Sequence, residues 1–139
     1  MLDEIVSHKR QETLAQKVQL PLPELLKKIS REPLPSFSSA IKQSEINVIA
    51  EIKYKSPSRG LFTCQLEPPE LARLYSENGA VALSVLTESR YFGGDIQFLK
   101  EIRKELKEIP LLRKDFILDR YQVVESRARG ASAYLLIVA

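Results

Sequence analysis

The sequence is poor in the residues that form metal centres and disulfides. Its 139 residues include one cysteine, Cys64, one histidine, His8, and no tryptophan. A single cysteine excludes a disulfide within the chain, which fits a reducing, cytoplasmic environment. One cysteine and one histidine are too few for a Cys/His metal centre, so we expect no metal. Cys64 has no neighbouring histidine to activate it, and we interpret it as a small loop or core residue.

The sequence also lacks long apolar runs and a strong excess of charge. No apolar run approaches the length that crosses a membrane, and no segment resembles a signal peptide, so we expect no membrane partner and no removed leader. The 21 basic and 18 acidic side chains give a net charge of +3, which is too balanced to indicate a nucleic-acid partner. Neither GxGxxG nor a P-loop lysine signature is present. The length and the 44% hydrophobic content fit one ordinary soluble domain.

The first part of the chain, residues 1–45, predicts a helical extension ahead of the main fold. Apolar residues recur at helical spacing in a charged segment, which predicts a helix over residues 1–17. His8 lies in this segment, and we expect it to be solvated. A second short helix is predicted over 22–30, and the prolines and serines of 31–43 indicate a linker leading into a short helical stretch.

From residue 46 to 139 the pattern alternates between strands and helices. Four apolar runs predict strands, at residues 48–53, 81–86, 110–114 and 133–138, and amphipathic segments predict helices at 66–78, 96–107 and 120–129. Glycines close two of these helices, Gly79 and Gly130, and a small residue opens the strand that follows each. Repeated βα units predict an α/β fold with a parallel sheet. Successive strands would lie side by side, as an open four-stranded sheet or half of an eight-stranded barrel.

The first predicted strand places charges at its carboxyl end. Alternation puts Glu51 and Lys53 on one face and Ile52 on the other. A loop of turn formers, residues 56–60, follows directly. Parallel α/β folds bind ligands at the carboxyl ends of their strands, so this stretch indicates a site. The alternative is an edge strand that carries a solvated charged pair.

The third predicted strand adds a second lysine. Lys114 and Phe116 share one face, so Lys114 would meet Glu51 and Lys53 if the two strands share a concave wall. Two lysines and a glutamate suit proton transfer on a neutral or anionic carbonyl compound. The alternative is a surface lysine paired with Asp115.

The loop after the second strand, residues 87–95, carries a further candidate wall. Gly93 and Gly94 permit a tight bend and a close approach of the backbone, and Phe92 could form an apolar wall. A flexible βα connection explains this loop equally well when it is read alone.

Together these motifs resemble one enzyme family. Residues 48–58, residues 83–88 with 91–94, and residues 112–116 are similar to indole-3-glycerol-phosphate synthase, and the resemblance spans essentially the whole chain. It implies a (β/α)8 TIM barrel in tryptophan biosynthesis. The family closes the ring of 1-(2-carboxyphenylamino)-1-deoxyribulose 5-phosphate, with decarboxylation and dehydration, and needs no cofactor.

The resemblance also implies roles for individual residues. Lys114 would be the general acid toward the substrate carbonyl. Lys53 would bind the substrate carboxylate and assist a later proton transfer, and Glu51 would support dehydration and orient the lysines. The remaining implied residues line the substrate site: Ser56 near the phosphate, Pro57, and the apolar walls Phe92, Phe116 and Leu135.

The length departs from the family. A TIM barrel has about eight βα units and about 250 residues, whereas four strands are predicted before Ala139. We therefore expect the N-terminal half of a barrel, inactive alone. The alternative is an interaction module that self-associates, or docks on a partner such as a C-terminal half barrel, through exposed sheet edges with idle site residues. A different sugar-phosphate barrel enzyme is a weaker alternative.

Overall fold

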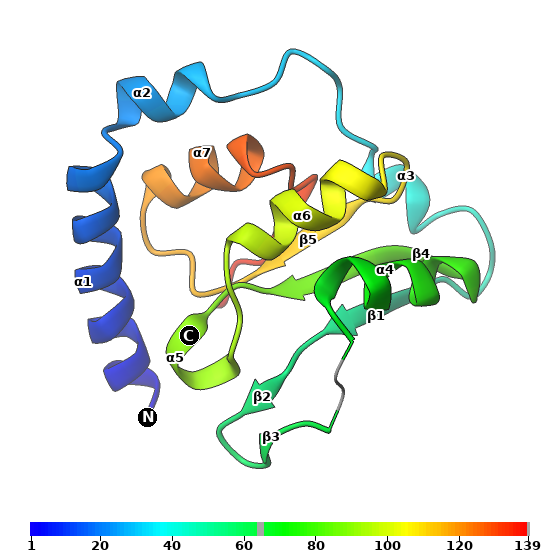
Figure 1. The fold of residues 1–139 in the computed structure, drawn as a ribbon, viewed down its shortest axis with the longest axis horizontal. Coiled ribbons are helices and arrows are strands. Elements are labelled where there is room, and N and C mark those ends of the chain that lie inside the picture. The colour runs from blue at the N-terminus through cyan, green and yellow to red at the C-terminus, as the bar shows by residue number, and fades with distance from the viewer. Residues whose placement is uncertain (64–65, 139) are drawn as a thin grey trace.

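A four-stranded parallel sheet forms the centre of the structure, a computed structural model that describes residues 1–63 and 66–138 (Figure 1). Its strands follow one another in chain order across the sheet: β1 (Val48–Ile52), β4 (Ala80–Leu86), β5 (Leu111–Lys114) and β6 (Ala133–Tyr134). The order confirms the prediction that successive strands lie side by side. Cys64, for which a loop or core position was expected, lies outside the described residues.

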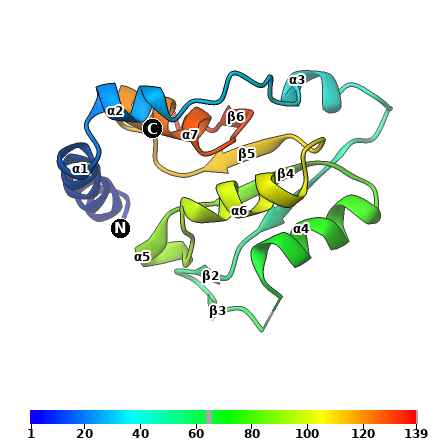
Figure 2. The same ribbon diagram turned by 45° about the horizontal axis from the view of Figure 1, so that its top comes forward.

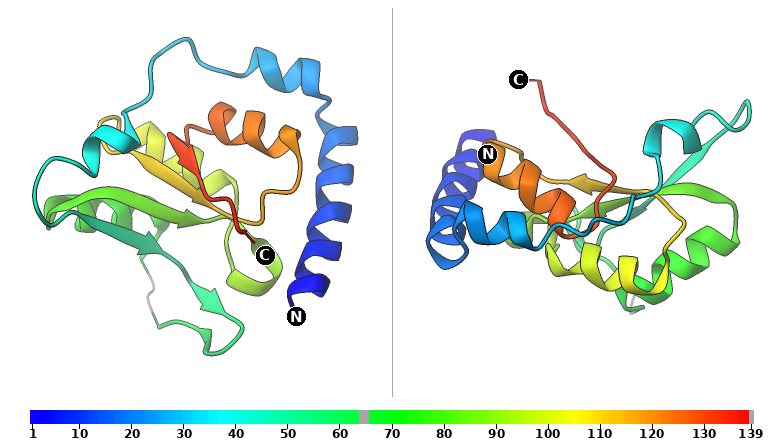
Figure 3. Two further views of the ribbon diagram at one scale, coloured as in Figure 1. Left: turned by 180° about the vertical axis from the view of Figure 1, so that it is seen from behind. Right: turned by 90° about the horizontal axis from the view of Figure 1, so that it is seen from above.

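Helices connect the strands and pack on one face of the sheet. They are α4 (Pro68–Glu77), α6 (Gln97–Glu105) and α7 (Arg120–Ala128). Viewed from above, α4 and α6 lie on one side of the sheet, and the chain after β6 leaves on the other (Figure 3). Helices on a single face are the arrangement of a barrel wall, in which the other face is the interior.

The apolar core lies between the sheet and these helices. Ile52, Leu83 and Leu111 from three strands pack with Leu71 of α4 and Leu99 of α6, and all five are buried. Since these strand residues point toward the helices, alternation sends their neighbours, including Glu51 and Lys114, to the open face.

Local sequence explains how α4 begins and ends. Glu67 and Glu70 form a capping box at its start, which satisfies backbone N–H groups that have no partner in the first turn. Gly79 follows the helix with φ +94°, a conformation that favours glycine. Gly130 follows α7 with φ +92°, so both glycines predicted to close helices do so.

Three helices precede the sheet, as the sequence predicts: α1 (Leu2–Gln19), α2 (Leu22–Lys27) and α3 (Phe37–Ala40). Figure 2 shows α1 and α2 beside α7 at one end of the sheet. The Tyr121 hydroxyl of α7 donates to the Leu20 carbonyl at 2.8 Å, and Leu25 of α2 is fully buried. The extension is therefore packed onto the main fold.

Two segments that were expected to be loops contain short regular elements. Residues 87–95 include a helical turn, α5 (Ser89–Phe92), because the buried Glu88 carboxylate accepts from three backbone N–H groups at its start. The polar turn after β1 is a hairpin of β2 (Lys55–Ser56) and β3 (Gly60–Leu61).

The fourth strand is shorter than predicted, since only Ala133–Tyr134 belong to the sheet. The Leu135 N–H still donates to the Arg113 carbonyl at 3.1 Å, after which the chain leaves the sheet (Figure 3). In the described part of the chain β6 has a strand neighbour on one side only. Periodicity identifies apolar strand formers, but a strand also needs partners for its backbone groups.

None of the helices in residues 1–63 and 66–138 combines the length and the apolar character that crossing a bilayer requires.

Candidate active site

Glu51 joins two lysines at the carboxyl end of the sheet. Its Oε1 lies 2.9 Å from Lys53 Nζ, and Lys114 Nζ donates to its Oε2 at 3.0 Å. Lys114 reaches Glu51 across β4, which lies between β1 and β5. The predicted meeting of the three side chains on one face is confirmed.

The alternative interpretation of the first strand, an edge strand with a solvated charged pair, is correct in one respect. β1 is an edge strand of the described sheet. Its charged pair is not freely solvated, however, because the Glu51 side chain is 31% exposed and Lys53 is 32% exposed, and a third charge from β5 joins them.

The electrostatics of this cluster favour an anionic ligand. Partial burial alone raises the pKa of Glu51, but the hydrogen bonds and charges of Lys53 and Lys114 outweigh it and hold that pKa below its ordinary value. Glu51 is therefore ionised at neutral pH. Two ammonium groups against one carboxylate leave one positive charge at the cluster, which can pair with a carboxylate or phosphate.

A cavity of about 490 Å³ opens beside Lys53. Four of the residues expected to form the site line it: Lys53, Ser56, Pro57 and Phe92. Four further lining residues were not singled out as site residues: Met1, Ser58, Arg59 and Phe62.

The sequence indicated some of these four additional lining residues more clearly than others. Arg59 belongs to the polar loop already assigned to the site, and its charge was the available signal. Phe62 lies just beyond the hairpin, and its ring is 5.6 Å from Lys53 Nζ, a cation–π distance. Met1 reaches the cavity through the docking of α1, which no local pattern specifies.

Two expected apolar walls meet, and a third does not reach them. The rings of Phe92 and Phe116 lie 6.3 Å apart between centroids, so the segments after β4 and β5 touch. Leu135 is half-buried at the end of β6 and does not line the cavity beside Lys53.

Comparison with known proteins agrees with this geometry. The family model described as indole-3-glycerol phosphate synthase matches residues 2–139. The chain belongs to the indole-3-glycerol phosphate synthase family. This is a TIM-barrel family, so the expected fold class is confirmed, with four parallel strands forming half a barrel.

Relatives named indole-3-glycerol phosphate synthase extend well beyond this chain. One from Chlorobium phaeobacteroides is 48% identical over 141 residues, covering 99% of this chain and 54% of the relative. One from Alkaliphilus metalliredigens is 43% identical over 141 residues, covering 100% and 54%. One from Leptospira interrogans is 51% identical over 118 residues, covering 81% and 46%. The chain spans about half the length of the curated relatives it matches.

In this indole-3-glycerol phosphate synthase family member, paired glycines shape the segment after β4. Gly93 has φ +63° and ends α5. A Cβ on Gly94 would clash with the backbone carbonyl oxygen of Leu86. The predicted close backbone approach is confirmed.

A buried charge cluster lies directly behind the site. Asp115 has a fully buried side chain and contacts Lys9 Nζ and Arg113 Nη2, each at 3.0 Å. Burial alone raises the pKa of Asp115, but the charges of Arg113 and Lys9 and the hydrogen bond from Thr87 hold it below its ordinary value. The alternative that paired Lys114 with Asp115 is wrong, since Lys114 pairs with Glu51 while Asp115 pairs with Lys9 and Arg113.

The expectation that His8 is simply solvated is also wrong. His8 is half-buried, its Nδ1 lies 3.4 Å from Arg90 Nη1, and its ring meets Tyr91 edge to face. Tyr91 also donates from its hydroxyl to Glu4 Oε1 at 2.9 Å. Helix α1 therefore contacts α5, which carries Phe92.

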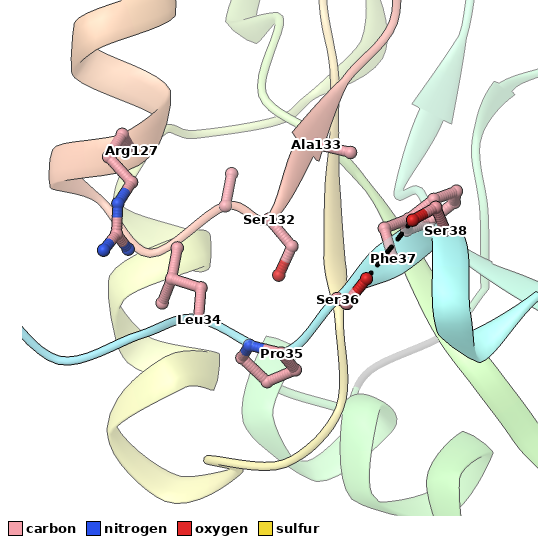
Figure 4. Close-up of a pocket in the computed structure, with 9 residues that line it drawn as sticks. Leu34, Pro35, Ser36, Phe37, Ser38, Arg127, Ser132 and Ala133 are labelled. Carbon is pink, nitrogen blue, oxygen red and sulfur yellow. Dashed lines mark hydrogen bonds between the residues drawn. The ribbon is translucent and has the colours of Figure 1, made fainter.

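A second hollow, of about 470 Å³, lies at the opposite end of the sheet, between the linker and the start of β6 (Figure 4). Leu34 and Ser36 line it from the linker, and Arg127 and Ser132 line it from the other side. Arg127 Nη2 donates to the Glu32 carbonyl at 2.9 Å. Its guanidinium thus ties the linker to α7.

No group of three or more His, Cys, Asp or Glu side chains suited to a metal ion occurs among residues 1–63 and 66–138.

Proposed function

We propose that this chain is the N-terminal half of an indole-3-glycerol phosphate synthase acting in tryptophan biosynthesis. The whole enzyme would close the ring of 1-(2-carboxyphenylamino)-1-deoxyribulose 5-phosphate, with loss of carbon dioxide and water. The observation that carries the proposal is the Glu51 carboxylate shared between Lys53 and Lys114 at the carboxyl end of the sheet.

The proposed roles follow from what each group can do at its position. The ammonium group of Lys114 would donate a proton to the substrate carbonyl oxygen as the ring closes. Lys53 lies beside the cavity and would pair with the substrate carboxylate. Glu51 holds both ammonium groups and would support the proton transfers of dehydration. These steps are acid–base chemistry, and we propose that they need no cofactor.

The other proposed site residues would hold the rest of the substrate. Ser56 is buried at the hairpin beside the cavity and would lie near the phosphate, with Pro57 next to it. Phe92 and Phe116 face each other and would hold the aromatic ring. Leu135 would join them only if the end of β6 moved toward the cavity.

We propose that activity requires a second half barrel. The open face of the sheet and its two edges, at β1 and β6, would be covered by further strands in a closed barrel. Ile49 at one edge and Leu136 after the other are exposed, which favours a partner that buries them. The partner would be a C-terminal half barrel rather than a nucleic acid or a membrane. The cytoplasmic location expected from the single cysteine stays a prediction.

The direct test joins this chain to the C-terminal half of the Chlorobium phaeobacteroides relative, a protein we call the completed barrel. We expect the completed barrel to form indole glycerol phosphate from the carboxyphenylamino substrate, and this chain alone to form none. A folded completed barrel without turnover would contradict the proposed function. Turnover by the 139-residue chain alone would contradict only the need for a second half.

A further inference from the structure

The residue after Lys114 is a buried carboxylate that the proposed reaction does not use. Asp115 Oδ2 accepts from the Thr87 hydroxyl at 2.6 Å and from Arg113 Nη2 at 3.0 Å. Its Oδ1 accepts from the Phe116 backbone N–H at 2.8 Å and contacts Lys9 Nζ at 3.0 Å. None of these contacts involves Glu51, Lys53 or Lys114.

Lys9 supplies the second cation for the two buried carboxylates of this cluster. Arg113 divides its guanidinium between two buried carboxylates, Asp115 at 3.0 Å and Glu125 at 2.9 Å. Lys9 is the second cation, 2% exposed, and it also pairs with Glu12 at 2.7 Å. Without Lys9, two buried carboxylates would share a single guanidinium, and an uncompensated buried charge is costly.

The contact between Lys9 and Asp115 lies directly after the end of β5, where it can influence the direction of the chain. Lys9 and the Phe116 N–H meet the same oxygen of Asp115. Asp115 directly follows Lys114, the last residue of β5, so the place where the Asp115 side chain is held constrains the direction in which Lys114 leaves the strand. A charged hydrogen bond from α1 is a firm anchor for this purpose.

We propose that Lys9 is a positioning residue: by clamping Asp115 from behind the sheet, it holds Lys114 against Glu51 and Phe116 against Phe92. As a statement about catalysis this rests on the proposed function. As a statement about the placement of Lys114 it stands without it.

The kinetic test compares Lys9→Gln with Lys17→Gln in the completed barrel. Lys17 is a matched control on the same helix, α1. It pairs with Asp119, four residues after Asp115, at 2.6 Å, but its side chain is 38% exposed. We expect Lys9→Gln to lower kcat by about tenfold or more with KM changed by less than about threefold, since a small displacement of a reacting group lowers turnover. Lys17→Gln should change both by less than about twofold. An unchanged kcat in folded Lys9→Gln would overturn the proposal.

A second measurement does not depend on activity. Mass spectrometry measures the rate at which acetic anhydride modifies Lys114 in the completed barrel. Hydrogen exchange of the Phe116 backbone amide is measured in the same protein. Lys9→Gln should change the Lys114 rate by about threefold or more and speed the exchange, whereas Lys17→Gln should change neither. Unchanged labelling and exchange would overturn the proposal. If the unsubstituted barrel folds but lacks turnover, the proposed function fails, and this labelling still decides the role of Lys9.

If Lys9→Gln does not fold, the double variant Lys9→Gln with Asp115→Asn replaces it. This variant removes one cation and one anion together and leaves Arg113 paired with Glu125. We expect folding to recover while the Lys114 labelling rate stays altered, because a neutral amide pair is a weaker clamp than a charged one. Recovery of both would show that Lys9 acts on stability alone.

Discussion

At the residue scale, Glu51 uses its two oxygens to hold two ammonium groups from different strands. Strand alternation predicted which of these side chains share a face, and their meeting also required β1 and β5 to lie on either side of β4 in one sheet. The contact between Lys9 and Asp115 could not be predicted in the same way. Periodicity shows that α1 is a helix among charges, but it does not show where that helix docks.

Lys114→Ala should reduce turnover of the completed barrel by about 10²-fold or more, because a general acid contributes on that order. The fold should be retained, since the Lys114 side chain is 39% exposed. Steady-state kinetics and thermal unfolding would measure the two effects. Lys104→Ala, an exposed lysine on α6, is the control and should match the unsubstituted barrel. Near-normal turnover in Lys114→Ala would remove this lysine from its proposed role.

Asp115 should make stability depend on pH in the acid range. Its pKa in the fold lies below the ordinary value, so its ionised form stabilises the fold above that ordinary value, near 3.8. This contribution is lost as the pH falls further, because the folded state must then bind a proton that the unfolded state already holds. Urea unfolding of the completed barrel should show Asp115→Asn well below the unsubstituted protein at neutral pH, with the gap narrowing below about pH 4. A gap that stays constant or widens on acidification would contradict the assigned charge state.

At the scale of elements, the three crossover helices were predictable from their hydrophobic period, and the four strands were predictable from their apolar runs. The turn α5 was not, since four residues carry no measurable period and the turn depends on Glu88 as its cap. The short β6 was missed because strand length depends on a neighbouring strand as well as on sequence.

Gly94→Ala should destabilise the protein by roughly 2 kcal/mol or more, because its Cβ would meet the Leu86 carbonyl and force the backbone to shift. Gly60→Ala provides the control. Gly60 also has positive φ, +67°, but nothing lies within 4 Å of an added Cβ, so only the conformational cost of about 1 kcal/mol applies. Urea unfolding of both variants in the completed barrel would compare them. Equal losses would show that the contact at Gly94 relaxes without cost.

At the scale of the molecule, α4 and α6 lie on one face of the sheet, and the chain after β6 leaves on the other. The repeated βα units, in which a glycine closes a helix before the next strand, predicted the parallel sheet. The family resemblance predicted the barrel. The division of the chain at residues 45 and 46 remains a prediction.

The isolated chain should associate with itself, because it exposes apolar residues such as Ile137 and Val138 beside an unpaired strand edge. Light scattering should give a mass above that of one 15.8 kDa chain. Adding the C-terminal half of the Chlorobium relative should replace these species with a complex of one copy of each. A stable monomer that ignores the added half would contradict this expectation.

The docking of α1 has a practical consequence for handling the protein. Met1 lines the cavity together with Lys53 and Phe92, so residues of a purification tag fused ahead of Met1 would begin beside the cavity. Acidic residues in such a tag would compete with small anions for Lys53 and Arg59. Ligand titrations should therefore use protein whose amino terminus carries no fusion.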